Sequence, residues 1–72
     1  MASYLIVIEG DGSTNYSAYC PDLPGVAATG ETVDECANEM REAISFHIEG
    51  LRESGELVPP PTSRGRTVEV AA

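Results

Sequence analysis

The chain begins with strand-like segments separated by turn formers. Residues 4–8 form a continuous apolar run rich in β-branched side chains. Such a run predicts a strand buried on both faces and therefore central in its sheet. Residues 9–15 are turn formers, and residues 16–20 predict a second strand that forms a hairpin with the first. After a proline-containing loop, residues 26–29 predict a short third strand.

A long amphipathic helix follows these strands. Thr32 and Glu35 have the spacing of a capping box, which begins a helix. Gly55 suits the position after a helix end, and the prolines at 59–61 cannot continue a helix. We therefore predict a helix over residues 33–53. Its apolar stripe recurs at three- and four-residue steps and consists of Val33, Cys36, Ala37, Met40, Ala43, Ile44, Ile48 and Leu51.

A last short strand is predicted at residues 67–70. The element order is then β-β-β-α-β, a small α/β (α+β) fold with one helix packed on one face of a mixed three- to four-stranded sheet. The last strand would run parallel to the first and lie beside it, because crossover connections are right-handed. Either this strand completes its own sheet or it is exchanged with a neighbouring chain. We name Val68 and Val70 as candidate oligomer-interface residues.

The helix covers only one face of this sheet. Depending on register, the other face carries Leu5 and Val7, or it carries the set Tyr4, Ile6 and Ile8. An apolar face left open usually marks an interface.

The length and net charge of the chain limit the classes of function that it can have. A chain of 72 residues is one domain at most, and a domain this small needs a source of stability beyond its core. Two cysteines and one histidine favour self-association over disulfides or metal. The net charge of −8 disfavours direct nucleic-acid binding and would attract a basic partner. Without a signal peptide or membrane span, a cytoplasmic protein is the simplest interpretation.

The loop at residues 21–25 restricts the chain more than any other segment, with its sequence Pro-Asp-Leu-Pro-Gly. One interpretation is structural: the loop turns the chain between strands, and Asp22 caps it by accepting backbone hydrogen bonds. The other is that the rigid loop borders a partner surface, because a rigid loop loses less entropy on binding. Our candidate partner-binding residues are Pro21, Asp22, Leu23, Pro24, Gly25 and Glu31.

Candidate chemistry is sparse. A nuclease-type metal cluster would need converging carboxylates, and those available, Glu9, Asp11, Asp22 and Glu31, read more simply as solvated turn residues. His47 is the single histidine and lies on the rim of the helical stripe, which favours a structural role. Cys36 fits a small core residue better than a nucleophile. We predict no catalytic residue, no metal and no cofactor.

Several motifs together resemble the HicB-like antitoxin domain family. They are a tyrosine-containing strand, the Pro21–Gly25 loop, the turn at residues 29–32, a helix with glutamate–alanine steps, and a closing proline run. The resemblance covers about residues 4–62. We expect the domain to span residues 1–62, followed by a tail at 63–72 with a short strand and no separate DNA-binding domain. It implies a partial ribonuclease H-like fold without nuclease activity, and homodimers or homotetramers.

The resemblance also implies a function. Members of this family bind a HicA-type toxin, a small basic protein that cleaves messenger RNA, and mask its active site. The alternative is a solitary homo-oligomeric domain that binds another protein or a small ligand and has no toxin partner.

Overall fold

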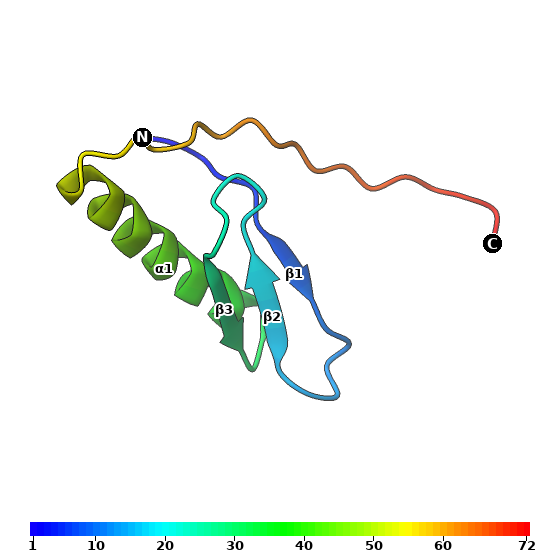
Figure 1. The fold of residues 1–72 in the computed structure, drawn as a ribbon. Coiled ribbons are helices and arrows are strands. Elements are labelled where there is room, and N and C mark those ends of the chain that lie inside the picture. The colour runs from blue at the N-terminus through cyan, green and yellow to red at the C-terminus, as the bar shows by residue number, and fades with distance from the viewer.

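The computed structural model describes all 72 residues. Three strands form an antiparallel sheet, and one helix lies across one of its faces (Figure 1). The strands are β1 (Val7–Glu9), β2 (Tyr16–Tyr19) and β3 (Ala27–Gly30), in the spatial order β1-β2-β3. The helix is α1 (Val33–Glu53). The predicted order of three strands and a helix is confirmed, and so is the α+β fold with one covered sheet face.

The strand register settles which face is open. Ala18 of β2 is buried and pairs with Ile8 on one side and Ala28 on the other. Tyr4, Ile6 and Ile8 pack against the core beneath the helix. Because alternate residues of a strand face opposite ways, Leu5 and Val7 belong to the open face.

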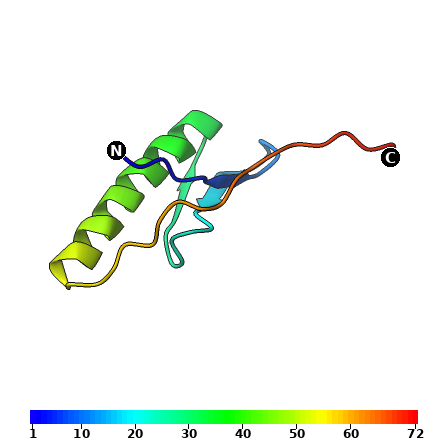
Figure 2. The same cartoon turned by 90° about the horizontal axis from the view of Figure 1, so that it is seen from above.

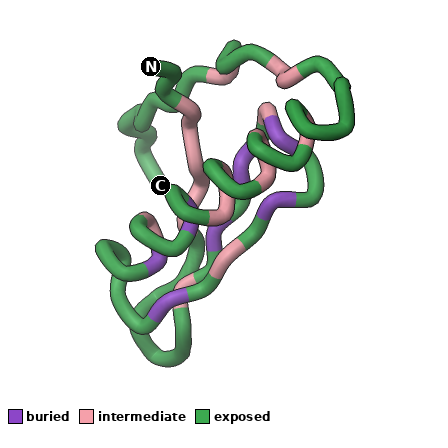
Figure 3. The backbone as a smooth tube through the Cα atoms, turned by 90° about the vertical axis from the view of Figure 1, so that its left-hand side faces the viewer, coloured by how far each residue is buried: buried purple, intermediate pink, exposed green.

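The core is small and lies between α1 and the β2–β3 half of the sheet. Only seven of 72 residues are buried. The buried hydrophobic side chains are Ala18, Cys20, Leu23, Val26, Cys36 and Met40, and they lie on β2, on the loop after it and on the inner face of α1 (Figure 3). Both cysteines are free thiols.

Local signals in the sequence determine both helix ends. The Thr32 hydroxyl oxygen accepts a hydrogen bond of 3.0 Å from the Glu35 backbone N–H. At the other end, Gly55 has a positive φ of 71° and donates to the Arg52 carbonyl at 3.1 Å. Glu56 donates to the Leu51 carbonyl at 2.9 Å, which completes a Schellman motif. The predicted bounds 33–53 are therefore confirmed.

Gly30 allows β3 and α1 to approach each other closely. A Cβ atom placed on Gly30 would lie 2.5 Å from the Cys36 backbone nitrogen and 2.8 Å from its Cα. Glycine is the residue that permits such an approach without a clash. The close approach at this turn lets the buried Cys36 pack against the sheet.

The last strand does not form within the chain. Residues 56–72 run without regular secondary structure, so the sheet has three strands and no parallel pair. The prediction that the first strand is central is wrong, because β1 pairs only with β2 and lies at an edge. The physical reason is the path after α1: the chain crosses the N-terminal segment and then extends away from the sheet (Figures 1 and 2). The single helix, α1, is not apolar enough over a sufficient length to cross a membrane.

Candidate partner-binding site

The Pro21–Gly25 loop is held by its own backbone and by one buried side chain. The Leu23 N–H donates to the Cys20 carbonyl at 3.1 Å, and the Val26 N–H donates to the Leu23 carbonyl at 3.3 Å. The Leu23 side chain is fully buried. Gly25 has a φ of 89°, a region that favours glycine. The loop therefore has a defined shape, with Pro21, Pro24 and Gly25 exposed at its surface.

Asp22 joins this loop to a distant segment. Its carboxylate accepts hydrogen bonds from both the N–H and the hydroxyl of Ser63, at 2.9 and 2.8 Å. It also accepts from the N–H and the hydroxyl of Thr62, at 3.0 and 3.2 Å. These bonds, the Ser63 pair foremost, lower the pKa of Asp22 below its ordinary value.

Two further contacts hold the same segment, residues 59–65, which we call the strap. The Tyr4 hydroxyl donates to the Pro59 carbonyl at 2.5 Å. Gly65 lies against Leu5, since a Cβ placed there would be 3.0 Å from a Leu5 methyl carbon. The strap thus crosses both the N-terminal segment and the Pro21–Gly25 loop, and it stiffens the loop from outside the core.

The structure separates the candidate residues into two groups. The loop lies beyond the paired end Tyr19–Ala27 of the β2–β3 hairpin. Glu31 lies beyond the opposite paired end, Tyr16–Gly30, and is exposed. The two groups therefore flank β3 from its two ends, and the outer edge of β3, which pairs with no strand, runs between them.

Within the loop, two candidate residues have structural tasks. Leu23 is buried, so it supports the loop from below. Asp22 has its carboxylate oxygens engaged by the strap. The other four candidate residues, Pro21, Pro24, Gly25 and Glu31, are exposed.

Two of the four carboxylates considered for a metal cluster, Asp11 and Asp22, accept hydrogen bonds from other residues of the chain. Asp11 accepts bonds from the Ser13 hydroxyl and N–H at 2.6 and 2.9 Å, and these bonds lower its pKa. Asp22 is committed to the strap. The structure contains no group of three or more histidine, cysteine, aspartate or glutamate side chains placed to hold a metal ion.

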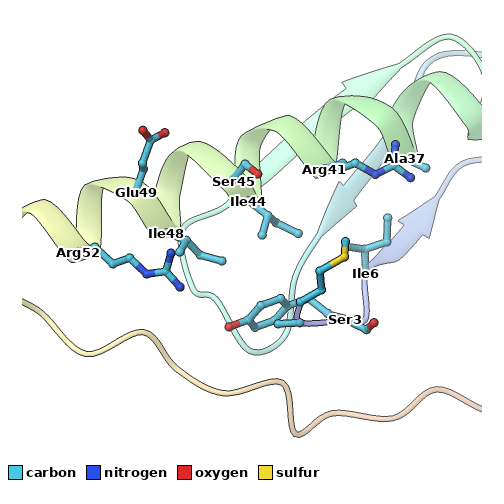
Figure 4. A pocket seen from close by; sticks show the side chains of 12 residues that line it. Ser3, Ile6, Ala37, Arg41, Ile44, Ser45, Ile48, Glu49 and Arg52 are labelled. Carbon is cyan, nitrogen blue, oxygen red and sulfur yellow. The ribbon is translucent and has the colours of Figure 1, made fainter.

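A groove between α1 and the N-terminal segment was not expected. It has a volume of about 760 Å³ and is lined mainly by Met1, Tyr4 and Ile6 on one side and by helical residues on the other. Ile44, Ile48 and Arg52 reach from the helix toward the N-terminal segment (Figure 4). The apolar stripe of the helix is wider than the sheet it covers, because α1 packs over β3 and β2 and hardly over β1. The apolar helix residues that the sheet leaves uncovered, such as Ile44 and Ile48, were the feature of the sequence that could have indicated this groove.

Sequence reasoning also missed Thr62 and Ser63, which no local pattern connects to Asp22. The contact joins residues 40 and 41 positions apart.

Comparison with known proteins identifies the family. A model of the HicB-like antitoxin of bacterial toxin-antitoxin systems matches residues 4–70. This chain belongs to the HicB-like antitoxin family. The match spans every strand, the helix and the strap, so it covers the loop and turn described above.

Solved and curated relatives agree with this assignment. The crystal structure of the N-terminal domain of the Burkholderia pseudomallei antitoxin HicB superposes with a TM-score of 0.71 at 41% identity, over 82% of this chain and 69% of that one. A 14.9 kDa protein from the rep-hol intergenic region of Haemophilus phage HP1 is 45% identical over 58 residues. This chain spans only 41% of the length of that phage protein. A UPF0150 protein of Thermoplasma acidophilum is 32% identical over 65 residues, 94% of its length.

Proposed function

We propose that this HicB-like domain binds a HicA-type toxin, a small basic ribonuclease, and blocks it by covering its active site. The observation that carries this proposal is the likeness to the HicB N-terminal domain at 41% identity, in sequence and fold together. In this mechanism the chain performs no chemistry of its own. It acts in the cytoplasm as a steric and electrostatic competitor for the RNA path.

The proposed contact surface is the outer edge of β3 with the residues that flank it. Pro21, Pro24 and Gly25 lie at one end of this surface and Glu31 at the other. The strap and the buried Leu23 hold the loop in one shape before the partner arrives, so less conformational entropy is lost on binding. An unpaired strand edge also offers backbone groups to a partner.

Charge supports the choice of a basic partner. The chain carries 12 acidic and 4 basic residues. Glu31 is followed at the start of α1 by Asp34 and Glu35, all three exposed. A basic ribonuclease would be steered toward this end of β3, and the association rate would fall as salt rises.

The test is co-expression with a candidate toxin, namely any small basic protein that a neighbouring gene encodes. Rescue of growth and a stable complex in light scattering support the proposal. If the basic neighbour is toxic and this chain neither rescues growth nor binds it, the proposal fails. A homo-oligomer that then binds an unrelated protein or small ligand would favour the alternative, a solitary binding domain.

A charge reversal locates the surface. Glu31→Lys should weaken toxin binding by about tenfold, a change of about 1.4 kcal/mol. Glu53→Lys is the matched control, since it makes the same change in net charge at the far end of α1. Equal losses in both variants would mean that charge acts over the whole domain and not through the β3 surface.

A further inference from the structure

The groove beside α1 has two apolar walls of different origin. One wall is the side of α1 that the sheet leaves uncovered, which includes Ile44 and Ile48. The other wall is the N-terminal segment, from which Tyr4 and Ile6 line the groove. The Tyr4 hydroxyl donates to the Pro59 carbonyl, so the strap holds this second wall in place. The groove is therefore largely preformed, as small-molecule sites usually are.

Half of the basic residues of this acidic chain lie at the groove. The chain has only four lysine and arginine residues against 12 acidic ones. Two of these four, Arg41 and Arg52, line the groove, roughly 16 Å apart along the helix axis. Ile44 and Ile48 lie between them in the sequence, and the one acidic lining residue, Glu49, points away from the N-terminal segment (Figure 4). The groove is thus an apolar surface with cations on both sides of its centre.

The two arginines differ in how free they are to bind an anion. The Arg41 guanidinium donates to the Asn38 side-chain oxygen at 2.7 Å. The Arg52 guanidinium reaches toward the N-terminal segment (Figure 4). An arginine in a last helical turn can serve to offset the negative end of the helix dipole. Here the carbonyls of Gly50, Leu51 and Arg52 already accept backbone hydrogen bonds, which leaves less negative charge for the Arg52 side chain to offset.

The size of the groove narrows the kind of occupant. Its volume of about 760 Å³ lies within the range of small-molecule sites, roughly 300–1,000 Å³. A helical peptide about 10 Å across would need roughly 1,200 Å³ to cover the same 16 Å of α1. Met1, at the end of the N-terminal wall, has a flexible thioether side chain that adapts to irregular apolar ligands. A slender apolar chain with an anionic end fits this volume and this charge pattern.

We propose that the groove binds a long-chain fatty acid. Its carboxylate accepts two N–H bonds from the Arg52 guanidinium, the paired geometry that arginine offers to carboxylates. Its alkyl chain lies over Ile48 and Ile44 and contacts Ile6 on the opposite wall. None of the residues that line the groove belongs to the β3 surface, so the proposal does not depend on any toxin.

The first experiment is isothermal titration calorimetry of the full chain with dodecanoate, below its micelle concentration. We expect saturable binding. Decanoate, which is two methylene groups shorter, should bind roughly tenfold more weakly because less apolar surface is buried. Dodecanol should also bind roughly tenfold more weakly, because it lacks the charge that Arg52 binds. No binding of dodecanoate, or equal binding of the alcohol, overturns the proposal.

A pair of variants tests the arginine. Arg52→Gln should weaken dodecanoate binding by roughly tenfold. Arg66→Gln is the matched control, since it makes the same change in net charge in the tail, away from the groove, and should bind as the unmodified chain does. Equal losses in both variants would show that the anion responds to net charge alone and would refute the assigned site.

Methyl NMR locates the ligand. Dodecanoate should shift the methyl signals of Met1, Ile44 and Ile48 and leave those of Val68 and Val70 unchanged, because these valines are 75% and 77% exposed in the tail. Equal shifts in the tail would mean detergent-like adsorption. Binding to phosphatidylglycerol vesicles without binding of free dodecanoate would mean a membrane surface. Shifts of Ile44 and Ile48 with protein concentration that exclude dodecanoate would mean that a second copy covers the groove. Each of these three results overturns the proposal.

Discussion

The carboxylate of Asp22 accepts hydrogen bonds from both the backbone N–H and the hydroxyl of Ser63, 41 residues later in the chain. A carboxylate has enough lone pairs to accept these bonds and the pair from Thr62 at the same time. Asp22 therefore works as a clamp between the Pro21–Gly25 loop and the strap. The Pro21–Gly25 loop, which the sequence motifs mark, and the strap, which they do not, are thus joined through Asp22.

Asp22→Ala should release the strap. Alanine has no side-chain acceptor, so all four hydrogen bonds from Thr62 and Ser63 are lost. We expect the backbone N–H groups of Thr62 and Ser63 to lose most of their protection in hydrogen exchange. Asp11→Ala is the matched control, because Asp11 holds only its own turn through Ser13. Unchanged protection at Ser63 in the Asp22 variant would contradict the clamp.

The clamp should open in acid. Hydrogen bonds from Ser63, followed by those from Thr62, lower the pKa of Asp22 in the folded protein from an ordinary value of 3.8. The stabilisation is therefore complete above the ordinary value and is lost as pH falls through the lowered one. In NMR, the amide signals of Thr62 and Ser63 should shift together below about pH 4. Asp22→Asn should abolish that shift, and a titration centred near neutral pH would contradict the mechanism.

Leu23→Ala should destabilise the domain and loosen the loop. Leu23 is fully buried, and removing such a side chain costs about 2–5 kcal/mol. Urea denaturation should show this loss, and the truncated loop should bind a toxin more weakly even though Leu23 does not reach the surface. Leu57→Ala is the control: Leu57 is 93% exposed, and we expect its substitution to change stability by less than about 0.5 kcal/mol.

Two glycines should respond in opposite ways to alanine. At Gly30 the new Cβ would meet the backbone of Cys36 at 2.5 Å, so α1 must shift and stability should fall by about 1–3 kcal/mol. At Gly50 the new Cβ meets nothing within 4 Å, and alanine favours the helix by about 1 kcal/mol. The denaturation midpoint should fall for the first variant and rise for the second. A rise for Gly30→Ala would show that the close approach is not required.

Much of the fold could be predicted because its signals are local. The capping threonine at 32 and the glycine at 55 determine both ends of α1 through contacts within a few residues. The turn formers between β1 and β2 likewise act at short range. The stripe of α1 identified its buried face, although Val33 at its start is 48% exposed.

The candidate site was predicted in its parts and not in its arrangement. The rigidity of the Pro21–Gly25 loop follows from its residues. Whether Leu23 points inward, and whether Glu31 lies near the loop, depends on the strand register, and the structure places Glu31 at the opposite end of β3. The groove beside α1 could not be read from the stripe alone, because its second wall is the N-terminal segment.

The sequence by itself determined the first three strands, the helix and its ends, the shape-restricted loop and the acidic composition, since each depends on neighbouring residues or on composition. Only the tertiary structure decided which sheet face is open, what Asp22 binds, and that the last residues leave the domain without a strand partner. These outcomes depend on contacts between residues far apart in the chain. The enthalpy of such contacts must offset the entropy of closing a long loop, and no local pattern records that balance.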